Sequence, residues 1–280
     1  MQKSIGGRGY TMSAPVPDRS LDSHHNTGNH DQAPLLTAAR ISLDRTGVSI
    51  TTRHALEFAL AHAQARDAVH SALALPSLLT ALQARNLPAI HVRSAASNRT
   101  EYLRRPDLGR TLAPASSAHL ASEPATDNLQ PATSSLTIIL ADGLSALAIE
   151  RHALPVLDAL LKLLKIGEPD ASWQLTPIVI AEQARVALGD EIGQALHASA
   201  TVILIGERPG LSSPDSLGAY ITWSPRPGRT DAERNCVSNI RHEGLDYHVA
   251  AAKIAWYIGE GRRLGLTGVA LRESDTALLP

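Results

Sequence analysis

The C-terminal half of the chain alternates continuous apolar runs with segments of helical periodicity. The runs that have the length and composition of buried strands are Leu136 to Leu140, Pro177 to Ile180, Val202 to Ile205 and Tyr220 to Trp223. A last helix is expected to begin near Asp246 and to bury Val249, Ala252 and Trp256. Buried strands that alternate with helices predict an α/β fold with a doubly wound, mostly parallel, Rossmann-like sheet.

The chain divides into four segments of different composition. Residues 1–35 are rich in Gly, Ser, Asn, Asp and Pro without apolar periodicity, which predicts a disordered tail. Residues 36–112 form a smaller helical region, in which Leu56 and Leu60 share one face with neighbouring alanines. Residues 113–135 contain three prolines and no Lys or Arg, which predicts an exposed linker. The Rossmann-like domain is then expected to occupy residues 136–280.

Charge and composition narrow the class of protein. The 280 residues carry a formal net charge of −1 without a Lys/Arg block, which argues against a dedicated nucleic-acid or membrane-surface binder. No apolar run approaches the ~20 residues of a membrane helix, and residues 1–35 lack the apolar core of a secretory signal. A single cysteine leaves no intramolecular disulfide and suits a reducing compartment. We therefore expect a cytoplasmic globular protein.

The strongest candidate for a site is the stretch from Thr201 to Asn239. Its apolar run ends abruptly in Gly206-Glu207-Arg208-Pro209-Gly210, as a buried strand does at the ligand-bearing edge of an α/β sheet. A carboxylate directly after such a strand is held in place and accepts hydrogen bonds from ligand amides or hydroxyls. Glu207 therefore qualifies as a ligand contact, although a salt bridge to Arg208 or another arginine explains it equally well.

Other chemistry-bearing residues have structural explanations. Cys236 has no histidine or helix start visibly placed to lower its pKa, so a small apolar role suits it better than nucleophilic attack. Asp142 fits a turn, and Ser145 and Asp190 fit helix caps. The phosphate-loop, dinucleotide, zinc-protease and hydrolase-nucleophile motifs are missing. The residues by themselves indicate a ligand-binding α/β domain without a catalytic set.

Several separated blocks nevertheless resemble one family, the light (small) subunit of adenosylcobalamin-dependent ethanolamine ammonia-lyase. The blocks are Tyr102-Leu103 with Arg105 to Arg110, Ala141 to Ser145, Val202 to Leu211 (VILIGERPGL), Ser224 to Arg226, and Asn235 to Ile240 (NCVSNI). The likeness is strong over residues 100–112 and 136–272 and weaker over residues 36–99. Blocks in the same order along the chain make this resemblance specific.

The resemblance implies a function that the residues alone do not show. Such a chain pairs with a heavy subunit, in a hetero-dodecamer, and the complex converts ethanolamine to acetaldehyde and ammonia by radical chemistry. The substrate site then lies in the heavy subunit, and adenosylcobalamin lies between the subunits. The family's cofactor contacts carry over by motif to Val186 in ARVALGDEIG, Glu207 in GERPG and Cys236 in RNCVSN.

The resemblance also implies that cobalt keeps its own dimethylbenzimidazole ligand. The D-x-H-x-x-G pattern of histidine-donating cobalamin domains is missing, because Asp246-Tyr247-His248 is followed by Ala251 at the glycine position. We therefore expect this chain to supply no metal ligand. The histidines to which this applies are His119, His152, His197, His242 and His248.

Some members of this family begin with a short amphipathic helix that directs packaging into a bacterial microcompartment. The first twenty residues here contain three glycines and two prolines, which oppose such a helix. A cytoplasmic location without this packaging signal is therefore the expectation from sequence.

A hypothesis from another class stays open beside this one. The same strand-end loops suit a stand-alone α/β protein that binds a nucleotide or a protein partner and has no lyase activity. The two hypotheses differ in what the isolated chain does: a nucleotide binder works alone, whereas a lyase subunit needs its partner to complete the cofactor site.

Overall fold

The computed structural model describes residues 45–123, apart from residue 47, and residues 134–272. All of these belong to one compact unit, Arg40–Pro280. The disordered tail predicted for residues 1–35 lies outside the described residues, and so do residues 124–133 of the predicted linker. Among the described helices, none is long and apolar enough to cross a membrane.

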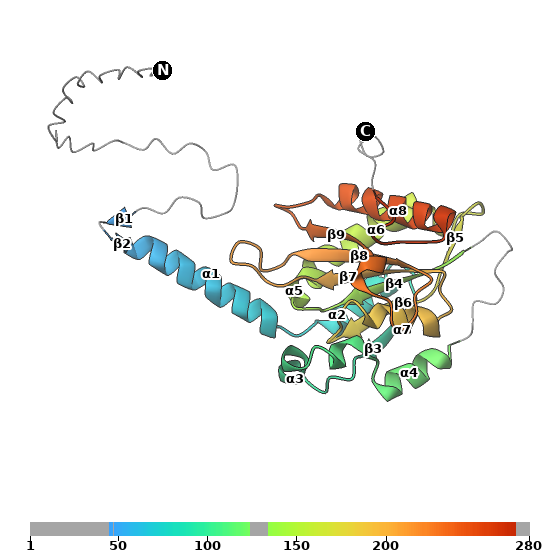
Figure 1. The fold of residues 1–280 in the computed structure, drawn as a ribbon, viewed down its shortest axis with the longest axis horizontal. Helices are drawn as coiled ribbons and strands as arrows, with labels where there is room; N and C mark the ends of the chain where they lie inside the picture. The colour runs from blue at the N-terminus through green and yellow to red at the C-terminus, as the bar shows by residue number, and fades with distance from the viewer. Residues whose placement is uncertain (1–44, 47, 124–133, 273–280) are drawn as a thin grey trace, which may run out of the picture. The chain divides into compact units, whose positions relative to one another are not determined.

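A seven-stranded sheet forms the centre of the described unit, with the order β3-β6-β4-β7-β8-β9 and with β5 paired to β4 (Figure 1). The strands are β3 (Ala89–Arg93), β4 (Ser134–Ala141), β5 (Trp173–Leu175), β6 (Ile178–Glu182), β7 (Ala200–Gly206), β8 (Leu217–Trp223) and β9 (Asn235–Ile240). The pairs among β3, β6, β4, β5 and β7 are parallel, whereas β7–β8 and β8–β9 are antiparallel. A separate small hairpin joins β1 (Arg45–Thr46) to β2 (Ser49–Ile50).

Helices cover the parallel part of the sheet on both faces. The helices of the described chain are α1 (Thr52–His70), α2 (Leu75–Gln83), α3 (Arg99–Arg104), α4 (Pro114–Ala121), α5 (Ala146–Ala148), α6 (Leu154–Leu163), α7 (Leu188–Ala195) and α8 (Tyr247–Leu264). Of these, α1 buries only Ala61 and Ala68 and does not cover the sheet, and α8 packs over β8 and β9. Leu82 of α2, Leu157 of α6 and Ile254 of α8 belong to the core on one face, and Leu120 of α4 and Ile192 of α7 belong to the core on the other. Successive residues of β4 and β7 alternate between these cores, as the strand period requires.

The antiparallel strands β8 and β9 are covered fully on one face and only in part on the other, where Thr222 is 3% exposed and Tyr220 packs against the core beneath α7. Ala219, Ile221 and Val237 join the core beneath α6 and α8. On the opposite face Tyr220 is only partly buried and Cys236 is exposed, because α7 packs over β4 and β7 rather than over this edge. The partly covered surface at this edge of the sheet therefore centres on Tyr220 and Cys236 in the described chain.

The predicted sheet is confirmed in its parallel part and wrong at this edge. The four predicted strands exist as β4, β6, β7 and β8, and most strand pairs are parallel as predicted. The sheet is nevertheless mixed rather than doubly wound throughout, because β8 and β9 are antiparallel. A parallel return needs a crossover of a dozen or more residues, usually a helix. Only the loop of residues 207–216 joins β7 to β8, so β8 runs back antiparallel.

The described segments before β4 also differ from the prediction. Residues 36–112 were predicted to be helical, yet β3 lies among them and pairs with β6. Residues 113–135 were predicted to be a linker, yet they contain α4 with Pro114 in its first turn. Neither element has strong periodicity, because β3 has only five residues and α4 is rich in Ala and Ser. Leu56 and Leu60, which share a face of α1 as predicted, are exposed.

The last helix starts where predicted but turns a different face inward. Asp246 caps α8 by accepting hydrogen bonds from the backbone N–H groups of His248 and Val249, at 2.8 and 3.3 Å. Val249, expected to be buried, is 48% exposed, whereas Tyr257 is 8% exposed. The buried face carries small alanines that let α8 approach β8 and β9 closely. The periodicity predicted an amphipathic helix, but packing against the sheet determines which of its faces is buried.

The turn that follows β4 packs at very short range against the carboxyl end of the neighbouring strand β7. The Leu144 N–H donates to the carbonyl of Gly206 at 2.9 Å, and Gly143 has a left-handed φ of +55°. A Cβ on Gly206 would lie 2.0 Å from the carbonyl oxygen of Ser145. Ser145 was expected to cap a helix with its side chain, but its Oγ donates instead to the carbonyl of Pro214 at 2.9 Å. This close approach fixes the start of the loop that contains Glu207.

Asp142, in the turn after β4, is a buried carboxylate with fixed partners. It accepts a hydrogen bond from the Ala184 N–H at 3.1 Å and lies 3.4 Å from a guanidinium nitrogen of Arg99. The same nitrogen donates to the carbonyl of Gly143 at 2.8 Å. Burial raises the pKa of Asp142 to about 6, although these partners favour its charged form.

The first prediction concerns the close approach at Gly206. Gly206→Ala should destabilise the chain by about 1–3 kcal/mol or more, because its methyl group would meet backbone atoms that cannot move aside. Gly259→Ala is the matched control, since a Cβ there meets nothing within 4 Å and the helix should gain up to about 1 kcal/mol. Urea denaturation of both variants measures the difference. Equal stability of the two would contradict the close approach.

The second prediction concerns pH. The folded state holds the Asp142 proton more tightly than the unfolded state. Ionisation of this carboxyl therefore lowers the free energy of unfolding as pH rises from about 4 to about 6. Over that window wild type should lose on the order of 2–3 kcal/mol relative to Asp142→Asn, which cannot ionise. Denaturation curves at several pH values measure this difference. Parallel pH profiles for the two proteins would show that Asp142 titrates normally.

Candidate functional site

A cavity of 430 Å³ opens at the carboxyl ends of β4 and β7, beside Tyr220 of β8. Val186 and Glu207, two of the three site residues predicted from sequence, both line it. The other lining residues are Tyr102, Gly143, Leu144, Arg185, Ile205, Gly206, Arg208 and Tyr220. The strand-end position expected for a ligand site is therefore a real hollow in the structure.

Glu207 is held by its neighbours in a defined position. The Ser216 hydroxyl and the Asn239 N–H both donate to its Oε2, the latter at 3.2 Å. Among the described residues, no hydrogen bond reaches its Oε1 and no ion pair is present, so the salt bridge considered from sequence does not form. A Cβ on Gly218 would lie 2.9 Å from Oε1, so glycine there leaves room for the carboxylate. One oxygen is thus anchored and the other remains able to accept.

Cys236 lies one strand further along, outside this cavity. Its position on β9 is directly opposite Tyr220 on β8, which puts both side chains on the partly covered face of these strands. The thiol is at the surface, yet surrounding atoms desolvate it and raise its pKa, while a hydrogen bond with Tyr220 lowers it. A raised pKa leaves little thiolate near neutral pH, so Cys236 suits an apolar contact better than a nucleophile.

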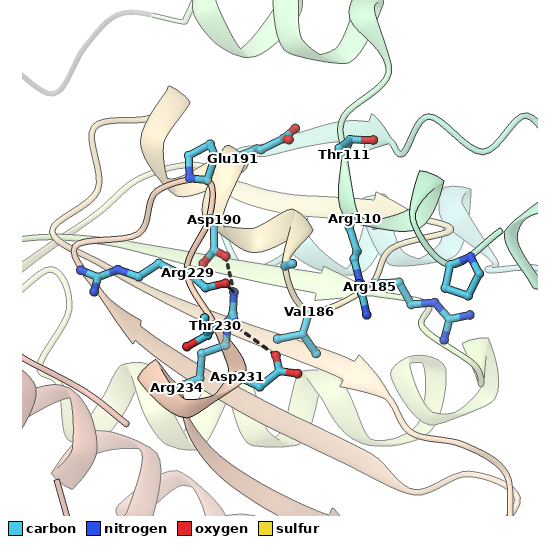
Figure 2. Close-up of a pocket in the computed structure, with 14 residues that line it drawn as sticks. Arg110, Thr111, Arg185, Val186, Asp190, Glu191, Arg229, Thr230, Asp231 and Arg234 are labelled. Carbon is cyan, nitrogen blue, oxygen red and sulfur yellow. Dashed lines mark hydrogen bonds and ion pairs between the residues drawn. The ribbon is translucent and has the colours of Figure 1, made fainter. Parts of the chain in front are cut away.

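A second, larger cavity of 660 Å³ adjoins the first, and Arg185 and Val186 line both (Figure 2). Its lining is rich in charge. The charged residues are Arg110, Arg185, Asp190, Glu191, Arg229, Asp231 and Arg234. The sequence did not identify this cavity, because its lining comes from three separate segments around residues 106–111, 185–191 and 227–234.

The arginine-rich block around residues 102–110 positions the loop that carries Val186. The Arg185 N–H donates to the carbonyl of Gly109 at 2.7 Å. The Tyr102 ring lies between two guanidinium groups, with Arg185 at 4.3 Å and Arg99 at 4.8 Å from its centroid. A Cβ on Gly109 would lie 2.9 Å from Arg185 and from Tyr102. This block is therefore a support for the site as well as part of its lining.

Asp190 connects α7 to the segment before β9 rather than capping a helix as predicted. It lies inside the first turn of α7 and forms a buried ion pair with Arg234, which also contacts Asp231 at 3.0 Å. Burial raises the pKa of Asp190 to about 6, while Arg234 lowers it. This chain of charges closes one side of the larger cavity.

The described linings of the two cavities contain arginines, carboxylates and tyrosines. Neither described lining contains a histidine, a cysteine or a lysine. Within the described ranges there is also no group of three or more His, Cys, Asp or Glu placed to hold a metal ion. The buried His152 lies elsewhere, with ring nitrogens 2.9 Å from the Tyr247 hydroxyl and 3.2 Å from Asp215.

Similarity to known proteins extends over nearly all of the chain. The family model described as "Ethanolamine ammonia-lyase light chain (EutC)" matches residues 29–272. A protein of Azotobacter vinelandii named "Ethanolamine ammonia-lyase small subunit" is 52% identical over 89% of this chain and 90% of its own length. Proteins with the same name from Bradyrhizobium diazoefficiens and Pseudomonas paraeruginosa are 50% and 51% identical, over 87% and 85% of this chain and 90% and 85% of their own lengths. The chain therefore belongs to the ethanolamine ammonia-lyase light-chain family.

Proposed function

We propose that this chain is the light subunit of an adenosylcobalamin-dependent ethanolamine ammonia-lyase and completes the cofactor site at its interface with the heavy subunit. The whole complex would convert ethanolamine to acetaldehyde and ammonia. The observation that carries the proposal is the partly covered surface of Tyr220 and the exposed Cys236, next to the cavity that Glu207 lines. A surface of this kind is half of a site, and a partner subunit would supply the other half.

The residues present fit a corrinoid. Its ring is broad, with apolar edges and a rim of amide groups that donate hydrogen bonds. Glu207 Oε1 has no hydrogen bond among the described residues and would accept from such an amide. Val186 and Cys236 would contact apolar parts of the ring from either side of Tyr220. When bound, the cofactor supplies the radical chemistry, while the protein binds and orients it and excludes water.

The substrate site would lie in the heavy subunit. The described cavities of this chain hold no histidine or lysine for proton transfer. Ethanolamine is a small cation, and the larger cavity has more arginines than carboxylates in its lining. Cobalt would keep its own dimethylbenzimidazole ligand, and the assembly would be a cytoplasmic hetero-dodecamer, as the family resemblance implies.

One observation favours a second function. The arginine-rich cavity of 660 Å³ has the size and charge for a nucleotide, which a stand-alone protein would bind without a partner. Titration of the isolated chain with AMP or ATP, followed by calorimetry, tests this alternative. Binding of a nucleotide in the micromolar range by the isolated chain would favour it.

The third prediction concerns the complex. Co-expression with a heavy subunit should yield an assembly that retains a corrinoid, visible by its absorption, and that deaminates ethanolamine. The isolated chain should bind adenosylcobalamin weakly, because half of its site is missing. Absence of deamination by a properly formed complex would refute the proposed function.

The fourth prediction concerns Glu207. Glu207→Ala should weaken cofactor binding by the complex roughly ten- to a hundredfold, because a charge-assisted hydrogen bond is worth ~1.5–3 kcal/mol. Glu207→Gln keeps an acceptor oxygen and should lie between wild type and the alanine variant. Glu168→Ala, which removes an exposed carboxylate that lines neither cavity, is the control. Cofactor affinity by equilibrium dialysis, with thermal unfolding to verify folding, distinguishes a binding role from a structural one. Unchanged affinity in Glu207→Ala would make this residue structural.

A further inference from the structure

Two arginines in the larger cavity carry charges that no carboxylate neutralises. Arg229 pairs with Glu233 at 2.5 Å, and Arg234 pairs with Asp190 and Asp231. For Arg110 and Arg185, by contrast, the described part of the chain provides no ion pair. The remaining carboxylate of the lining, Glu191, accepts a hydrogen bond from the Leu112 N–H at 2.7 Å. Positive charge is therefore concentrated at one side of this cavity.

Arg185 is held in position rather than free in solvent. Its guanidinium stacks on the Tyr102 ring at 4.3 Å from the centroid, and one terminal nitrogen donates weakly to the Tyr102 carbonyl at 3.5 Å. Its Nε is buried without a hydrogen-bond partner in the described structure, as are one terminal nitrogen of Arg99 and the Nε of Arg234. Arg234 differs from Arg185 in that two carboxylates pair with it. A buried guanidinium nitrogen without an acceptor is costly, so an acceptor from a ligand would improve the site.

The arrangement of the cavity directs an anion to these two arginines. Figure 2 shows the Asp190–Arg234–Asp231 chain on one side of Val186 and Arg110 with Arg185 on the other. The carboxylates with cationic partners are thus kept apart from the arginines without partners. Because Arg185 and Val186 line both cavities, an anion bound here lies next to the ligand at the strand ends.

The chemistry of the arginines identifies the kind of anion. Guanidinium groups bind phosphate oxygens with paired hydrogen bonds and keep their charge at every physiological pH. A volume of 660 Å³ exceeds that of an isolated phosphate and lies within the range of about 300–1,000 Å³ typical of small-molecule pockets. The cavity therefore suits a phosphodiester with an organic group attached.

From these observations we propose that Arg110 and Arg185 bind the phosphodiester of the cofactor's nucleotide tail, and that the larger cavity accommodates part of that tail. The inference rests on the proposed function, since adenosylcobalamin carries one phosphodiester, between the corrin and its base. Val186 and Glu207 would contact the corrin, while Arg110 and Arg185 would hold the phosphodiester. Arg185, which lines both cavities, marks the boundary between the two parts of the ligand.

The test compares two corrinoids on the complex with the heavy subunit. Adenosylcobinamide lacks the phosphodiester and the nucleotide, whereas adenosylcobalamin has both. Arg110→Ala should weaken adenosylcobalamin binding about tenfold or more, as expected for a lost charge-assisted contact, and leave adenosylcobinamide binding unchanged. Affinities are measured by equilibrium dialysis with absorption detection, so no turnover is required. The difference between the two ligands isolates the contact with the tail.

Three further variants make the result specific. Arg110→Lys keeps the charge and should recover part of the lost affinity for adenosylcobalamin only. Arg66→Ala removes an exposed arginine of α1 that lines neither cavity and should change neither affinity. Arg185→Lys should weaken adenosylcobalamin binding as Arg110→Ala does, and thermal unfolding shows whether its packing on Tyr102 survives. Arg110 is the primary site because no described residue depends on its side chain for a hydrogen bond.

The outcomes separate this inference from the proposed function. Equal losses for both corrinoids, or no loss for either, would overturn the assignment of the phosphodiester while leaving the cofactor proposal intact. A wild-type complex that binds neither corrinoid would refute the proposed function itself. A selective loss for adenosylcobalamin that Arg110→Lys partly restores supports the phosphate-binding role.

Discussion

The close approach of the turn at Gly143, after β4, to Gly206 at the end of β7 is the constraint on which the candidate site depends. Two backbone segments meet there at a distance that excludes a methyl group, and the hydrogen bond from Leu144 to Gly206 joins them. Glu207 is the next residue, so its backbone starts from a position set by the sheet. The anchoring of Oε2 by Ser216 and Asn239 then orients the carboxylate. The rigid end of β7 thus fixes the position of the Glu207 carboxylate, which is a hydrogen-bond acceptor.

The short loop after β7 has a second consequence, because it reverses the chain and leaves Tyr220 and Cys236 only partly covered on the face of β8 and β9 opposite α8. An α/β sheet covered on both sides would bury Tyr220 and Cys236 in its core. In this chain the partly covered face adjoins the cavity at the strand ends and the arginine-rich cavity beyond Val186. The fold therefore combines a stable, doubly covered centre with an edge available to a ligand and a partner.

The sequence supported a large part of this description. Continuous apolar runs identified β4, β6, β7 and β8, and the motif around Glu207 located the cavity at the end of β7. The antiparallel edge escaped prediction, because an apolar run specifies a buried strand but not its direction. Arg185 and Tyr220 also escaped, since a stacked guanidinium and a tyrosine on a partly covered sheet face have no distinctive local pattern. Asp190 fitted a cap by its position, yet its buried partner Arg234 lies far away in sequence.

Local pattern was enough for the strands of the sheet centre, the helix start at Asp246 and the family, because each depends on residues close together in the chain. Which face of α8 is buried, how β9 is placed beside Tyr220, and which arginines lack a carboxylate required the three-dimensional arrangement. These properties depend on contacts between segments up to about a hundred residues apart, and neither periodicity nor motif spacing extends over such separations. The larger cavity beside Val186 belongs to this second group, because three separate segments form its wall.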